Sequence, residues 1–67
     1  MAITYKPLWK LLIDKGIKKG ELCKLANVAP ATVTKMGSGA HVSTDTIEKI
    51  CVALDCSVAD VVEVERN

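Results

Sequence analysis

The sequence predicts a small all-α domain in which five short helices surround one hydrophobic core. The chain has 67 residues, of which 49% are hydrophobic, and this is enough for one compact core and too little for a second domain. Apolar residues recur at helical spacing along most of the chain. Prolines, serines, glycines and an asparagine separate these stretches at the positions that helix ends favour. We therefore treat residues 1–67 as a single domain.

The first predicted helix spans residues 7–15. Pro7 suits the first helical turn, and Gly16 suits the residue at which a helix stops. The members of its apolar stripe are Leu8, Leu11 and Leu12. Trp9 and Ile13 lie four residues apart on a flank of that stripe, so they need a second cover, either from the C-terminal tail or from a partner chain.

A short turn joins the second and third predicted helices, which start at residue 18 or 19 and at residue 30. Asn27 tolerates the left-handed conformation of a tight turn, and Pro30 opens the third helix. The predicted inward residues are Leu22, Cys23, Ala26, Val33 and Met36. Gly37, Ser38 and Gly39 end the third helix and begin a loop that runs through His41.

The fourth predicted helix has the clearest amphipathic pattern and is capped by Ser43 or Thr44. Its inward residues are Ile47, Ile50, Cys51 and Leu54. Ser57 and Asp60 resemble a capping box that opens a short fifth helix. Residues 61–65 alternate towards their end, so they could form a short strand paired with residues 3–5.

The charge of the chain is unevenly distributed, although the net charge is only +1. Residues 1–41 hold seven lysines against Asp14 and Glu21, whereas residues 42–67 hold two basic residues against six acidic ones. A molecule with a basic half and an acidic half can meet phosphates with one side. A solvated charged face explains any single lysine equally well.

The cysteines and the N-terminus exclude several other classes of protein. Cys23, Cys51 and Cys56 are an odd number without a CxxC pair, so no disulfide framework is expected. Together with His41 they could supply four zinc ligands, but the spacing is unlike that of zinc sites, so we expect no metal and no cofactor. The N-terminus has neither a signal peptide nor an anchor pattern, which favours the cytoplasm.

Residues 17–62 resemble the Cro and phage-repressor (XRE-type, lambda-repressor-like) helix-turn-helix family. The stretch from Lys19 to Met36 carries the motif, with Leu22 and Cys23 inward, Asn27 in place of the usual turn glycine, and Val28 as the apolar turn residue. The following segments STDTI, ICVAL and DVV also match the family pattern. The resemblance implies a five-helix DNA-binding domain whose third helix enters the major groove.

The resemblance also implies which residues contact DNA. The base-reading positions on the third helix are Pro30, Ala31, Thr32, Thr34 and Lys35. This helix has no Arg, Asn or Gln, which make bidentate contacts to bases, so sequence readout should be modest or depend partly on DNA shape. The expected phosphate contacts are Lys18, Lys19, Gly20, Ser38, His41, Lys10 and Lys6. For Gly20, fraying of the first turn is an equal alternative, and for His41 a plain solvent-exposed position is the alternative.

The leading hypothesis is a sequence-selective binder of double-stranded DNA, a transcriptional regulator and most simply a repressor, that acts as a homodimer. The candidate dimer surface consists of Trp9, Ile13, Leu25, Val61, Val62 and Val64, although a monomer could bury these residues beneath its own tail. A second hypothesis is a protein-interaction module of the same fold, an antitoxin or a phage accessory factor, with weak or no specific DNA binding. An enzyme is not expected, because the sequence offers no nucleophile–base pair, phosphate loop or carboxylate dyad.

Overall fold

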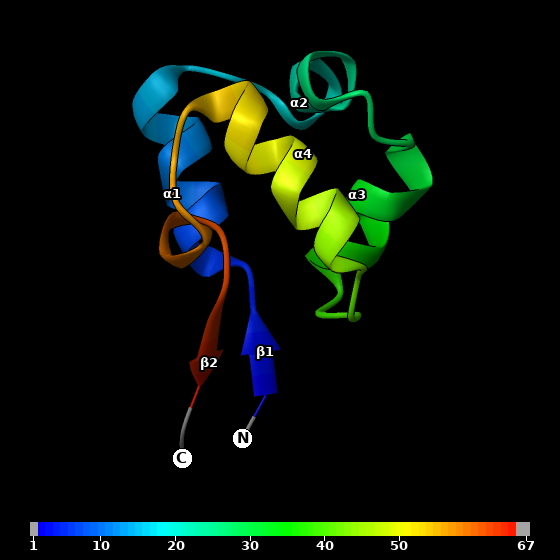
Figure 1. Cartoon of the computed structure of the whole chain (residues 1–67), viewed down its shortest axis with the longest axis vertical. Coiled ribbons are helices and arrows are strands. Elements are labelled where there is room, and N and C mark those ends of the chain that lie inside the picture. Colours follow the sequence, from blue (N-terminus) through cyan, green and yellow to red (C-terminus); the bar gives the residue numbers. More distant parts are fainter. Residues whose placement is uncertain (1, 66–67) are drawn as a thin grey trace.

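The computed structural model describes residues 2–65, which form four α-helices flanked by two short strands (Figure 1). The elements are β1 (Ala2–Thr4), α1 (Lys6–Lys15), α2 (Lys19–Ala26), α3 (Pro30–Gly37), α4 (Thr44–Leu54), the 3₁₀ turn η1 (Val58–Asp60) and β2 (Glu63–Glu65). Figure 1 shows α4 in the centre, with α1 and α3 on opposite sides and the two strands together below α1. None of the helices within residues 2–65 is long and apolar enough to cross a membrane.

The predicted fifth helix is wrong, because residues 58–60 make only one 3₁₀ turn. The predicted cap is present, since the Ser57 N–H donates a hydrogen bond to the Asp60 carboxylate at 3.1 Å. However, the next residue, Val61, is completely buried, and the chain enters β2 two residues later. A cap therefore starts a helical turn here, and core burial and strand pairing end it.

The two strands pair antiparallel, with Ile3 opposite Val64 at the centre of the register. The predicted pairing of the two ends of the domain is thus confirmed, except that Tyr5 is not part of the strand. Tyr5 precedes α1 as its N-cap residue and is 2% exposed. Its hydroxyl donates a hydrogen bond to the Ala40 carbonyl at 2.8 Å, which ties the loop after α3 to the start of α1.

The core contains side chains from every helix, from the turn after α2 and from the segment after η1. Its members are Tyr5, Leu8, Leu12, Leu22, Ala26, Val28, Val33, Met36, Ile47, Ile50, Leu54 and Val61. The predicted inward residues Leu11, Cys23 and Cys51 are half-buried at its edge. Val61 is 0% exposed, so its place on the candidate dimer surface is wrong: the tail of the same chain inserts it into the core.

Candidate nucleic-acid interface

A tight turn sets the geometry between α2 and α3. Asn27 ends α2 in the left-handed conformation, with φ 55° and ψ 48°, as the sequence predicts. Val28 follows, 8% exposed, and its N–H donates to the Cys23 carbonyl at 3.0 Å. Ala29 is extended, and Pro30 then starts α3. The left-handed residue and the buried valine thus reverse the chain within a few residues, which is the arrangement of a helix-turn-helix.

The helix α3 has one buried face and one free face. Val33 and Met36 are 2% and 1% exposed and anchor the helix to the core. The residues exposed on α3 include Pro30, Ala31, Thr34 and Lys35, whereas Thr32 is half-buried. Four of the five predicted base-reading residues therefore present their side chains to solvent, and Thr32 has the least accessible side chain of the set.

The free face of α3 offers little hydrogen-bonding chemistry. The Thr34 hydroxyl donates to the Pro30 carbonyl at 3.1 Å, a local bond that uses its proton within the helix. The Ser38 hydroxyl likewise donates to the Lys35 carbonyl at 2.9 Å. What remains for a partner is the carbon surface of Pro30, the acceptor lone pairs of the hydroxyls and the ammonium group of Lys35.

Lys19 extends from α2 to two other helices. Its Nζ atom lies 4.5 Å from the centre of the Trp9 ring on α1, within the range of a cation–π interaction. A methyl group built on Gly37, the last residue of α3, would lie 3.8 Å from the same Nζ atom. The ammonium group is therefore held near the place where α1, α2 and α3 approach one another.

A groove of about 540 Å³ separates α2 from α3 on this side of the molecule. Its lining residues are Lys19, Gly20, Cys23, Lys24, Pro30, Val33, Thr34 and Gly37. Lys24 is one of the seven lysines of the basic half and was not among the predicted contacts. Helical periodicity could have assigned Lys24 to this groove, because residues 20, 23, 24 and 27 share one face of a helix with a 3.6-residue repeat.

The N-terminus of α2 combines basic and acidic groups. Lys18 is the N-cap residue, and its backbone N–H points to the Glu21 carboxylate at 3.5 Å, a long hydrogen bond. A lysine side chain has no acceptor, so only one half of a capping box is formed. The Glu21 charge therefore already occupies part of the positive field that a phosphate would use here. Gly20 is exposed, and a Cβ atom on it would meet nothing within 4 Å.

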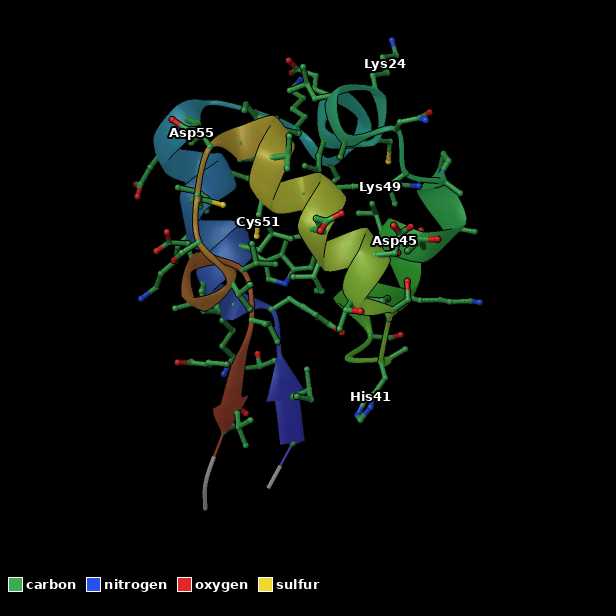
Figure 2. The ribbon with its side chains drawn as sticks, in the orientation of Figure 1. Lys24, His41, Asp45, Lys49, Cys51 and Asp55 are labelled. Carbon is green, nitrogen blue, oxygen red and sulfur yellow. The ribbon has the colours of Figure 1, made fainter. Side chains whose placement is uncertain are left out.

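Three other predicted phosphate contacts do not gather around Lys19. Lys10 lines a separate groove together with Asp14 and Asp60. Lys6 forms an ion pair with Glu65 at 2.6 Å, and this pairing raises the pKa of Lys6 above its usual value. His41 is exposed in the loop after α3, and Figure 2 shows it below α3 and α4, whereas Lys24 is at the top of the molecule. The basic groups that lie together are therefore Lys18 and Lys19 at the start of α2 and Lys24, which lines the α2–α3 groove with Lys19.

The fold and the free face of α3 define a helix-turn-helix domain, and comparison with known proteins identifies the family. The sequence model of the Cro/C1-type HTH DNA-binding domain matches residues 7–67. The chain belongs to this Cro/C1-type family, as the resemblance in its sequence implies.

Among solved structures, the chain is similar to the transcriptional regulator VanUg in its crystal form II. The two are 40% identical with a TM-score of 0.87, over 92% of this chain and 83% of the VanUg chain. No curated protein matches the sequence. The family and this structural similarity support a DNA-binding regulator, the class that the sequence favours over an enzyme.

Proposed function

We propose that this chain is a sequence-selective, double-stranded DNA-binding transcriptional repressor that inserts α3 into the major groove. The observation that carries the proposal is the free face of α3 beside the lysine-lined groove between α2 and α3. A single helix fits the roughly 12 Å width of the major groove of B-form DNA. The buried Val33 and Met36 fix which side of α3 is presented.

Base reading would depend on few groups. Pro30 and Ala31 provide carbon surface for thymine methyl groups, and Lys35 can reach guanine O6 and N7 or a phosphate. Thr34 can offer its methyl group and its remaining lone pairs, since its proton is already used. With this set, part of the selectivity should come from the shape and deformability of the DNA.

Phosphate contacts would come mainly from the N-terminal half of α2. Lys18 and Lys19 stand at the helix N-terminus, where free backbone amides also favour an anion. Gly20 lets a phosphate approach the backbone, because no side chain covers it. Lys24 extends the positive surface along the groove. Ser38, His41 and Lys10 stay candidates for contacts further along the duplex.

The protein would act in the cytoplasm as a homodimer. One small recognition helix gives limited affinity, and a dimer that contacts two half-sites gains the affinity of both. Among the candidate residues, Ile13, Leu25 and Val64 are 78%, 57% and 54% exposed. Trp9 and Val62 are partly covered by their own chain. Leu25 shares a shallow groove with Val52, a 77% exposed residue that the sequence analysis did not select. We place the dimer contact at this pair, which Glu48 and Lys49 flank with opposite charges.

Selection of bound sequences from random duplex DNA tests the proposal. We expect enrichment of a two-fold symmetric site, and we expect Lys35→Ala to relax the preference at one position of each half-site. The sparse chemistry of α3 is an observation that supports a second candidate, a protein-interaction module such as an antitoxin or a phage accessory factor. That candidate predicts no enriched sequence, and such a result would overturn selective DNA binding.

A further inference from the structure

The C-terminal end of α4 brings two cysteines together. Asp55 ends the helix in the left-handed conformation, with φ 52° and ψ 55°. The Cys56 N–H donates to the Cys51 carbonyl at 3.0 Å, and the Asp55 N–H donates to the Val52 carbonyl at 3.4 Å. This pair of bonds is the Schellman motif, in which the side chains at the positions of Cys51 and Cys56 characteristically touch. The backbone hydrogen bond between the two residues therefore keeps Cys51 and Cys56 together at the end of α4.

The environment of the two thiols agrees with this contact. The Cys51 thiol lies close enough to the Cys56 thiol to act on it directly. Both residues are half-buried and line one groove, which they share with apolar residues of α4 and of the segment around η1. Figure 2 shows Cys51 near the end of α4 that Asp55 closes. The thiols are thus close to each other and reachable from solvent through the groove.

The neighbouring groups determine what such a pair can bind. Lys15 and Asp60 carry opposite charges near the Cys56 thiol. Within residues 2–65 no group of three or more His, Cys, Asp or Glu side chains could hold a metal ion. Cys23 lines the α2–α3 groove instead, so the four-ligand zinc arrangement considered from the sequence is not assembled. Zinc favours four ligands and calcium or magnesium favours oxygen, whereas two sulfur atoms suit a soft ion of low coordination number.

We propose that Cys51 and Cys56 form a two-thiol site for a soft monovalent cation, the chemical class of Cu(I) and Ag(I). On binding, the two S–H bonds break, two sulfur–metal bonds form, and two protons pass to solvent. The oxidation state of the ion does not change. The bound ion would connect the last turn of α4 to the segment before η1, a link that is independent of the proposed DNA-binding face.

Titration of the reduced full chain with Ag(I) tests the site. We expect one ion per chain in native mass spectrometry and a higher Tm for the loaded protein, because an ion that binds only the folded state stabilises it. Cys51→Ser and Cys56→Ser should each lose the bound ion. Cys23→Ser is the matched control and should keep it, since Cys23 lies in a different groove.

Alkylation of the wild-type chain gives a readout that does not depend on how the variants fold. Compared with the same reaction without the ion, one equivalent of Ag(I) should reduce iodoacetamide labelling of Cys51 and Cys56 and leave that of Cys23 unchanged, as mapped by peptide mass spectrometry. Protection of Cys23 instead, retention of the ion by the Cys51→Ser/Cys56→Ser double variant, or an ion that links two chains would each overturn the proposal.

Discussion

The Lys19 ammonium group lies 4.5 Å from the centre of the Trp9 ring, so a residue of α1 holds the side chain of a residue of α2. A free lysine side chain has about 2 kcal/mol of rotamer entropy to lose when it is fixed on a ligand. A lysine that rests on an aromatic ring has already lost part of this freedom. Trp9 is therefore, in our proposal, a positioning residue for a phosphate contact.

Replacing the ring tests this role. Trp9→Leu keeps apolar volume and removes the π face, so we expect affinity for every duplex to fall about two- to fivefold, the equivalent of about 0.5–1 kcal/mol for an exposed cation–π interaction. Fluorescence anisotropy of labelled duplexes measures this change in affinity. In a Lys19→Ala background the same change should have no further effect. Fully additive losses would show that Trp9 acts independently of Lys19.

Substitutions of lysines at different positions should affect DNA binding in different ways. Lys19→Ala should weaken binding to all sequences alike and make the dependence on salt shallower by about one unit of slope, as the loss of one phosphate contact requires. Lys35→Ala should reduce discrimination at one base position, by about 1–3 kcal/mol if it contacts guanine. Lys10→Ala is the comparison and should weaken binding less, because Asp14 and Asp60 in the same groove offset the charge of Lys10. A loss for Lys10→Ala as large as that for Lys19→Ala would misplace the basic face.

Gly20 offers a test in which stability and binding should move in opposite directions. Gly20→Ala meets no atom within 4 Å, so the higher helix propensity of alanine should raise stability by up to about 1 kcal/mol. We expect DNA affinity to fall at the same time, because the methyl group stands where a phosphate would approach. Gly37→Ala is the comparison, since its Cβ would make only ordinary contact with Lys19. Unchanged affinity in Gly20→Ala would leave first-turn fraying as the explanation of this glycine.

The cap of α4 should contribute measurably to folding. The Ser43 hydroxyl oxygen accepts a hydrogen bond from the Thr46 N–H at 3.3 Å, and losing such an N-cap costs about 1 kcal/mol. In a domain of this size, we expect Ser43→Ala to lower Tm by about 4–8 °C, measured by circular dichroism. Ser38→Ala should have a smaller effect, because that hydroxyl only adds a second donor to the Lys35 carbonyl, which already accepts from the Ser38 N–H.

The ion pair between Lys6 and Glu65 gives a prediction at alkaline pH. The hydrogen bond to Glu65 raises the pKa of Lys6 above the usual 10.5, so the folded state holds the proton of Lys6 more tightly than the unfolded state does. The stabilisation is therefore fully present below pH 10.5 and is lost as the pH rises through the folded pKa. We expect a small, salt-sensitive difference in unfolding free energy between the wild type and Lys6→Gln that disappears in this range. A difference that persists unchanged beyond it would mean that the charge of Lys6 is not involved.

Local signals in the sequence predicted most of the fold. Pro7, Pro30 and Ser43 marked helix starts, and Asn27 marked the turn, because each depends on backbone preferences that neighbours do not override. The fifth helix was predicted wrongly for the same reason: the Ser57 and Asp60 cap is real, but the burial of Val61 is a tertiary effect. Tyr5 was wrongly assigned to the strand. The hydrogen bond that fixes its position joins it to Ala40, far away in the chain, and such a contact leaves no local signal in the sequence.

The site was less predictable than the fold. The free face of α3 follows from helical periodicity, and so would the place of Lys24 in the groove. The contact between Trp9 and Lys19 does not follow from periodicity, because it depends on the angle at which α1 and α2 cross. The proximity of Cys51 and Cys56 could not be predicted for a different reason. It depends on a left-handed residue after α4, and this residue is Asp55, whereas glycine is the residue that usually indicates such a helix end.

The dependence of affinity on salt for random duplex DNA tests the central claim most directly. About five phosphate contacts per chain should give a plot of log K against log salt with a slope of about −4 to −5, and steeper for a dimer. We therefore expect clear binding at low salt that weakens steeply as salt is added. Absence of binding at low salt, or an affinity that salt does not change, would contradict a DNA-binding function for this face.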